Sequence, residues 1–111
     1  MNHERLACYQ KLIEAASQIA KVVKRWPRGY GYLEDQIERA ICSSILNLAE
    51  GNGKRAAHAE RHRFFNISLG SISEVCACLD LSFAFSLITS RELDSLKLLL
   101  TEAFCGIRKL P

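Results

Sequence analysis

Two histidines, His58 and His62, stand four residues apart, a spacing that places both imidazoles on one face of a helix. A zinc ion would need a third or fourth ligand, and no other residue is spaced to supply one. The intervening Ala-Glu-Arg departs from the H-E-x-x-H order of zinc hydrolases, and the cations Arg61 and Arg63 disfavour a metal ion beside them. We therefore expect no metal site and interpret the two histidines as part of a solvated helix.

The remaining polar residues do not match a known catalytic pattern. The sequence contains no Glu-x-x-His pair of the kind that di-iron bundles use, no G-x-S-x-G nucleophile elbow and no Walker A loop. Its five cysteines include no C-x-x-C pair, and Cys76 and Cys78 would point about 200° apart on a helix. We interpret the cysteines as small buried side chains in a reducing compartment. The sequence predicts no cofactor and no enzymatic activity.

Two clusters of lysine and arginine residues favour the binding of phosphate groups. The stretch from Lys21 to Arg28 holds four cations and no acid, and the stretch from Lys54 to Arg63 holds four more with Glu60 as its acid. The net charge is only +3, so the argument rests on clustering and not on total charge. Clusters of this size also occur on solvated faces that bind nothing. The candidate nucleic-acid-binding residues are Lys21, Lys24, Arg25, Arg28, Lys54, Arg55, Arg61 and Arg63.

The composition describes the scaffold that must hold these residues. The 111 residues are 49% hydrophobic and 24% charged, with six glycines and two prolines. This is typical of one globular domain, here residues 1–111, and it favours long helices over a loop-rich β-fold. Uncharged stretches such as Leu81–Ser90 are far shorter than the ~20 residues that span a bilayer, and we find no signal-peptide pattern. We expect a cytoplasmic protein without a membrane partner.

Apolar residues recur every three or four positions along four segments, which predicts four helices. The expected helices are residues 4–25, 33–50, 57–87 and the chain from Thr89 onward. Pro27 stops the first helix and Gly51 begins the turn after the second. Thr89 and Glu92 fit a capping box at the start of the fourth. Because the connections are short, we expect an all-α protein built as an antiparallel up-down-up-down four-helix bundle.

The third expected helix is apolar over nearly its whole circumference. Its inner face is predicted to hold Phe64, Phe65, Leu69, Ile72, Val75, Cys76, Leu79 and Phe83. A second apolar group falls on the other side and consists of Ile67, Cys78, Leu81 and Phe85. A bundle of four helices leaves each helix an outer face, so a helix that is apolar all round needs a second partner surface. We expect that surface to be another copy of the chain, which makes the protein a homo-oligomer.

The second expected helix carries a polar row beside its apolar face. The row consists of Gln36, Arg39, Ser43, Asn47, Glu50 and Lys54. Asn47 and Glu50 face the expected path of a second polar group, on the third helix. That group consists of Ser68, Ser71 and Glu74. Two interpretations are open: a buried polar network that fixes the helix register, or a functional groove that recognises a ligand.

The same two helices carry a pair of motifs. The first reads Gln36-Ile37-x-Arg39-Ala40, then Ser43, then Asn47-Leu48-Ala49-Glu50-Gly51 and Lys54, and the second reads Phe64-Phe65-x-Ile67-Ser68-x-Gly70-Ser71 followed by Glu74. They resemble the signature of the 23S ribosomal RNA intervening-sequence protein family, and the similarity extends over nearly the whole chain. Two positions depart from the pattern. Ile45 stands where the family often has a proline, which predicts a straighter helix, and Ser44 replaces a usually apolar residue.

The resemblance implies a small bacterial cytoplasmic protein that assembles as a ring, commonly a pentamer, and has no catalytic activity. A related bundle is the accessory subunit of diversity-generating retroelements, which binds a reverse transcriptase and nucleic acid. The positions that match the family motifs are Arg39, Asn47, Glu50, Gly51, Gly70, Ser71 and Glu74. The resulting hypothesis is a non-enzymatic, homo-oligomeric bundle that binds RNA or DNA through its basic patches. The alternative is a protein-interaction or scaffold module, such as a reverse-transcriptase accessory subunit.

Overall fold

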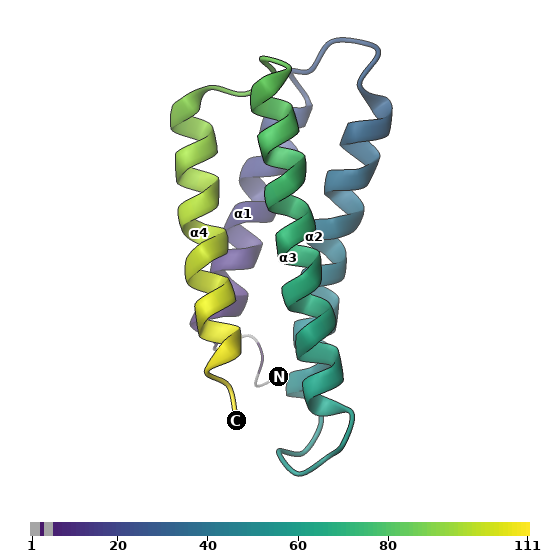
Figure 1. Ribbon diagram of the computed structural model, residues 1–111, viewed down its shortest axis with the longest axis vertical. Helices are drawn as coiled ribbons and strands as arrows, with labels where there is room; N and C mark the ends of the chain where they lie inside the picture. The colour runs from purple at the N-terminus through teal and green to yellow at the C-terminus, as the bar shows by residue number, and fades with distance from the viewer. Residues whose placement is uncertain (1–2, 4–5) are drawn as a thin grey trace.

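The computed structural model describes residues 3 and 6–111, and over this range the chain is all-α. The helices are α1 (Ala7–Val23), α2 (Gly31–Asn52), α3 (Arg61–Ala84) and α4 (Ser90–Arg108). They lie side by side in a rod of 46 × 23 × 21 Å (Figure 1). Helices α1 and α3 each pack against both α2 and α4, so the four helices enclose one core. The prediction of a four-helix all-α protein is confirmed.

The two ends of the rod carry different connections. The α1–α2 and α3–α4 connections lie together at one end, which we call the apical end (Figure 1, top). The α2–α3 connection lies at the other, basal end, together with the last residue, Pro111 (Figure 1, bottom). This alternation is the arrangement expected for an up-down-up-down order. It also separates the two basic stretches of the sequence, because the first belongs to the apical end and the second to the basal end.

The start of α4 follows the predicted capping box. The Glu92 amide donates to Thr89 Oγ1 at 3.1 Å, and the Thr89 amide donates to Glu92 Oε1 at 2.9 Å. Each side chain thereby satisfies a backbone N–H that the first helical turn leaves without a partner. The first residues of the predicted first helix, 4 and 5, lie outside the described residues, and α1 begins at Ala7.

Helix α3 is shorter at both ends than the predicted span of residues 57–87. Residues before Arg61 form turns instead, with the His58 amide donating to the Arg55 carbonyl at 2.8 Å. At the other end Ser86 adopts φ +61°, and the Leu87 amide donates back to the Ser82 carbonyl at 2.8 Å. This is a Schellman-type ending, which glycine usually provides. Because a serine and not a glycine occupies the left-handed position, the end of this helix could not be predicted from the residue types.

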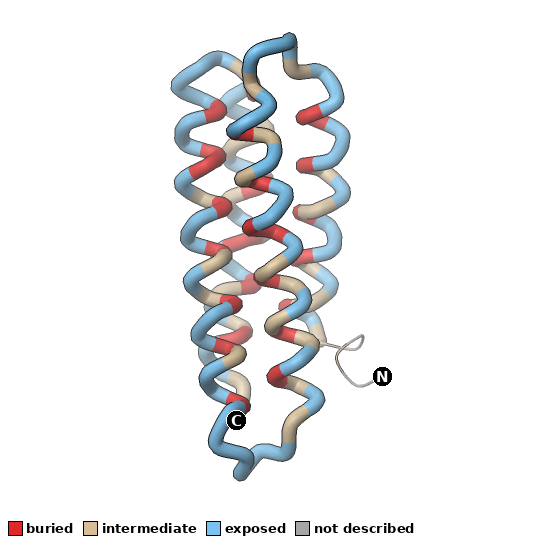
Figure 2. Tube along the Cα trace, turned by 90° about the vertical axis from the view of Figure 1, so that its right-hand side faces the viewer, coloured by how far each residue is buried: buried red, intermediate tan, exposed pale blue. Residues whose placement is uncertain are grey.

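The buried residues lie on the inward faces of all four helices (Figure 2). Most of them are aliphatic, joined by Phe65, Cys8 and Cys78. The largest fully buried members of the core are Leu12, Ile19, Ile37, Leu48, Ile72, Leu79, Leu96, Leu100 and Ile107. The three-and-four periodicity of the sequence predicted these positions, because residues so spaced share one face of a helix. Burying a side chain of this size contributes roughly 1.5–3 kcal/mol, so the aliphatic core is the main source of stability.

Two predictions for α3 are wrong. Phe83, placed on the inner face by the sequence pattern, is 44% exposed, and Cys78, placed on the other side, is buried. The inward positions near the end of α3 are taken by Leu79 and Ser82. The Ser82 hydroxyl donates to the Cys78 carbonyl at 2.7 Å, so this polar group can be buried without a penalty. The sequence pattern placed Phe83 on the inner face of α3 because phenylalanine is apolar, whereas the adjacent Ser82 is polar.

By length and composition alone, α3 is also a helix that could cross a membrane. A core helix of a soluble protein meets the same test, and α3 contributes Ile72, Val75 and Leu79 to the core. A single helix of this kind is therefore weak support for a membrane location.

Candidate nucleic-acid interface

Arg61 is a structural residue, which corrects its prediction as a nucleic-acid-binding residue. Its side chain is only 6% exposed at the start of α3. Its Nη1 donates to the Gly51 carbonyl at 3.1 Å and to the Lys54 carbonyl at 2.8 Å, while its Nε donates to the Pro111 carbonyl at 2.6 Å. The Asn52 carbonyl, 3.4 Å from Nη1, is a fourth acceptor. A guanidinium held by four carbonyls inside the protein is not displayed to a phosphate.

The position of Arg61 follows from the end of α2. The last carbonyls of a helix have no partner within the helix and carry the negative end of its dipole. Arg61 places a positive charge on those carbonyls and stacks on the Phe65 ring, with 4.8 Å between the guanidinium carbon and the ring centre. Gly51 permits this approach, because a Cβ at that position would lie 2.7 Å from the Phe65 ring. The family-motif residue Gly51 therefore serves the packing of α2 on α3.

The other cations of the second basic stretch do reach the surface. Arg55 and Arg63 are exposed and Lys54 is half-buried. Lys54 Nζ and the Arg63 guanidinium both lie over the Phe64 ring, at 5.7 and 4.9 Å from its centre. Glu60 is a weak partner for Arg63, with 3.5 Å between the carboxylate oxygen and the guanidinium nitrogen. This stretch therefore displays positive charge that is only partly balanced.

Two further cations meet this group at the basal end. Arg108 and Lys109 are exposed at the end of α4, two or three residues before Pro111. Because the Arg61 guanidinium holds both the Pro111 and the Lys54 carbonyls, the end of α4 lies beside the α2–α3 connection. We call the resulting surface the basal cluster; it consists of Lys54, Arg55, Arg63, Arg108 and Lys109. Sequence reasoning missed its last two members, since no spacing rule relates residues 54 and 109.

The first basic stretch forms the apical cluster, defined by Lys21, Lys24, Arg25 and Arg28. Arg25 is paired with the carboxylate of Glu92 at the start of α4. A hydrogen bond from the Thr89 amide, together with this arginine, holds the pKa of the Glu92 carboxyl below its usual value. The other three cations are exposed. The structure therefore places the two predicted clusters at opposite ends of the rod and neutralises one member of the apical cluster.

Two residues of the polar row of α2, Ser43 and Asn47, take part in a hydrogen-bond network at the interface with α3. Ser43 Oγ lies 2.8 Å from Ser71 Oγ, and Asn47 Nδ2 donates to the Ser43 carbonyl at 2.8 Å. Ser68 Oγ donates to the Ser44 carbonyl at 2.7 Å, and both of these serines are fully buried. The Ser44 hydroxyl donates within its own helix to the Ile41 carbonyl, 2.7 Å away, which gives this buried polar group a partner. The geometry favours the interpretation that the network fixes the register of α2 against α3.

The charged motif residues lie outside this network. Glu50 and Glu74 are exposed, and Arg39 is exposed and paired with Asp35 on its own helix at 3.0 Å. Gly70 faces open space, because a Cβ added there would meet nothing within 4 Å. These residues therefore belong to the surface of the bundle and are available to a partner.

The outer side of the α2–α3 pair carries exposed apolar residues. Leu46 is one turn beyond Ser43 on α2, and Ile67 is one turn before Ser71 on α3, so both flank the polar network. Leu46 is 67% exposed. The outer α2–α3 face, as we define it, consists of Tyr32, Leu46, Ile67, Leu81 and Phe85.

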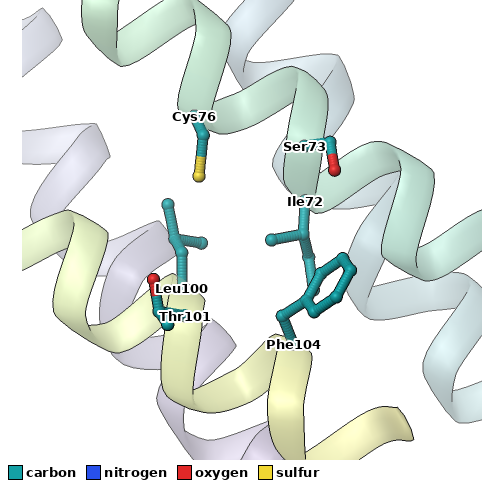
Figure 3. Close-up of a pocket in the computed structure, with 6 residues that line it drawn as sticks. All are labelled: Ile72, Ser73, Cys76, Leu100, Thr101 and Phe104. Carbon is teal, nitrogen blue, oxygen red and sulfur yellow. The ribbon is translucent and has the colours of Figure 1, made fainter.

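An apolar pocket of about 250 Å³ lies between α3 and α4 (Figure 3). Its lining residues are Ile72, Ser73, Cys76, Leu100, Thr101 and Phe104. Burial raises the pKa of the Cys76 thiol, so the thiolate that a nucleophile needs is disfavoured. Within the described part of the chain, no three His, Cys, Asp or Glu side chains gather as a metal site would require. The pocket therefore offers mainly apolar contact, with the hydroxyls of Ser73 and Thr101 at its lining.

These features define a class of protein: an all-α four-helix bundle with a buried polar register network and exposed cations at its ends. The family model described as 23S rRNA-intervening sequence protein matches residues 4–107, which is nearly the whole sequence. The chain therefore belongs to this family, as its two helix motifs indicated. A search of curated proteins finds no match.

Proposed function

We propose that the protein is a non-enzymatic, homo-oligomeric four-helix bundle that binds RNA or DNA through the exposed cations at its ends. The observation that supports this most directly is the basal cluster, in which cations from three parts of the chain meet and, among the described residues, Glu60 alone pairs with one of them. Membership of a family described by an intervening sequence of 23S rRNA agrees with a nucleic-acid ligand. The proposed location is the bacterial cytoplasm.

Self-association would strengthen the attraction of the protein for a nucleic acid, because each copy adds its positive charge. One chain carries a net charge of +3, which is a weak field for a polyanion. Five copies, the number that the family resemblance suggests, would together carry +15. The outer α2–α3 face supplies the apolar area that such an assembly would cover. Both parts of the proposal are testable separately, because charge and self-association involve different residues.

The binding experiment is a fluorescence-anisotropy titration of fragments of 23S rRNA and of a 20-base-pair DNA duplex, repeated at several salt concentrations. We expect binding that weakens steeply with salt, because each phosphate contact releases condensed counterions. The absence of binding to every probe at 50 mM salt contradicts the proposal. Light scattering on the same sample reports the assembly, and a 12.5 kDa species alone at micromolar concentration contradicts its homo-oligomeric part.

A protein-interaction module is the second candidate, and the exposure of Leu46 and Phe85 on the outer α2–α3 face favours it. This role would depend on apolar contact and not on the basal cations. The two candidates make opposite predictions for a variant in which Arg55 and Arg63 are replaced by glutamate. Nucleic-acid binding would be lost, whereas capture of a protein partner on the α2–α3 face would be retained.

A further inference from the structure

The basal end differs from the apical end in how its cations are brought together. Arg61 Nε and Nη1 hold the carbonyls of Pro111 and Lys54, which lie 50 and 7 residues away in the sequence. The ends of α2 and α4 are thereby fixed next to the start of α3. The Arg61 contacts therefore bring the cations of the α2–α3 connection close to those at the end of α4, although the two groups are far apart in the sequence.

We propose that the basal cluster is the surface that contacts nucleic acid, that Arg108 and Lys109 belong to it, and that its ligand is the sugar–phosphate backbone. This inference rests on the proposed function and specifies the end of the molecule, the residues and the chemistry of recognition. Arg61 acts within it as a positioning residue, because its own charge is buried.

Three observations favour the basal over the apical end. Arg25 of the apical cluster is neutralised by Glu92, whereas Arg108 and Lys109 have no acidic partner among the described residues. The end of α2 would ordinarily present negative carbonyl ends to a phosphate, but Arg61 occupies them. The basal residues come from three segments, so they form a surface and not a single row.

The chemistry of the cluster points to phosphates and not to bases. Stacking of an unpaired base requires the open face of an aromatic ring. Phe64 lies among these cations with Lys54 and Arg63 over its ring, and the exposed His62 ring meets the Phe65 ring edge to face at 5.9 Å. Arginine and lysine side chains are suited to phosphate oxygens, whose positions do not depend on sequence. We therefore expect double- and single-stranded probes to be bound without sequence preference.

The test compares two double variants of the full chain that each remove two positive charges. R108Q/K109Q changes the basal cluster, and K24Q/R28Q is the matched control at the apical end. Anisotropy titrations use a labelled 20-base-pair DNA duplex between 50 and 200 mM salt. If each basal residue contacts one phosphate, the slope of log K against log salt falls by about 1.8, which is about 60-fold in affinity near 0.1 M salt. The control is expected to lose less than about threefold.

Two controls show whether the variants are folded and whether the loss of affinity comes from the basal cluster. All four substituted residues are exposed, so circular dichroism and the melting temperature should match those of the parent. A second basal variant, R55Q/R63Q, must reproduce the loss from a different segment of the chain.

The outcomes separate this inference from the proposed function. An equal or larger loss in K24Q/R28Q, or unchanged binding in R108Q/K109Q, overturns the basal assignment while nucleic-acid binding stands. Failure of the parent protein to bind the duplex and its single strands at 50 mM salt overturns both, and then favours a protein partner. A strong preference for single strands would overturn the assignment of the backbone as the ligand.

Discussion

Replacing Arg61 with methionine is expected to destabilise the bundle by about 3 kcal/mol. Methionine keeps an unbranched apolar stem next to Phe65 but removes every donor that the guanidinium provides. The carbonyls of Gly51, Lys54 and Pro111 then lose a charged partner at 3.1, 2.8 and 2.6 Å. The Gly51 contact is the buried one; its carbonyl keeps the Lys54 amide as a donor at 3.1 Å but loses a charged donor, and a hydrogen bond to a charged group contributes about 1.5–3 kcal/mol. Water can reach the other two, so we assign them about 1 kcal/mol together.

This loss is large enough to measure by thermal unfolding. At about 2.1 cal/mol/K per residue, 111 residues give an entropy of unfolding of about 230 cal/mol/K. A loss of 3 kcal/mol therefore lowers the melting temperature by about 13 °C. The assay is circular dichroism at one fixed protein concentration, because self-association would make the melting temperature depend on concentration.

Arg63 provides the matched control for this experiment. It lies two residues away on the same helix and is exposed; it contacts Glu60 at 3.5 Å and lies over the Phe64 ring at 4.9 Å. Replacing it with methionine should change stability by less than about 1 kcal/mol. An R61K variant should fall between the two, because one ammonium cannot reach carbonyls on both sides of the guanidinium. If R61M melts within 2 °C of the parent, the assignment of Arg61 as a structural clamp is refuted.

The other predictions concern packing, pH and assembly. Replacing Gly51 with alanine should cost about 1–3 kcal/mol in urea unfolding, because its Cβ would lie 2.7 Å from the Phe65 ring; an unchanged midpoint would show that the ring moves freely. The pKa of Glu92 is lowered in the folded state, so its contribution is present above the usual glutamate pKa and is lost as the pH falls through the lower value. The melting-temperature difference between the parent and E92Q should therefore be greatest near pH 7 and shrink below pH 4; a constant difference would contradict this. Replacing Leu46 with glutamate should dissociate the proposed homo-oligomer in light scattering, whereas the same change at Leu98, 61% exposed on α4, should not.

The register network explains why serines are found inside an apolar core. Ser44 and Ser68 are fully buried, and each hydroxyl donates to a backbone carbonyl at 2.7 Å. A shift of α2 along α3 would leave Ser68 without its acceptor, which costs more than the bond itself contributes. Buried serines therefore favour one alignment of the two helices, whereas an all-apolar interface would tolerate several.

The helices themselves could be predicted from the sequence because the interactions that form them are local. Apolar residues three and four apart share a face whatever surrounds the helix, and the capping box joins Thr89 to Glu92 within one turn. The family motifs are local in the same sense, since each lies within a single helix. These features determined the fold class and indicated the family.

The exposure of each charge was decided by tertiary structure alone. Arg61, Arg63 and Lys54 are equivalent in the sequence as members of one basic stretch, yet Arg61 is buried because carbonyls 10 and 50 residues away converge on it. The same convergence brings Arg108 and Lys109 to the basal end. Near the end of α3 the buried position is likewise occupied by Ser82, whose hydroxyl donates to the Cys78 carbonyl, while the neighbouring Phe83 is exposed. A pattern along the chain records which residues are polar, but only the packed helices determine which polar groups find partners and which remain for a ligand.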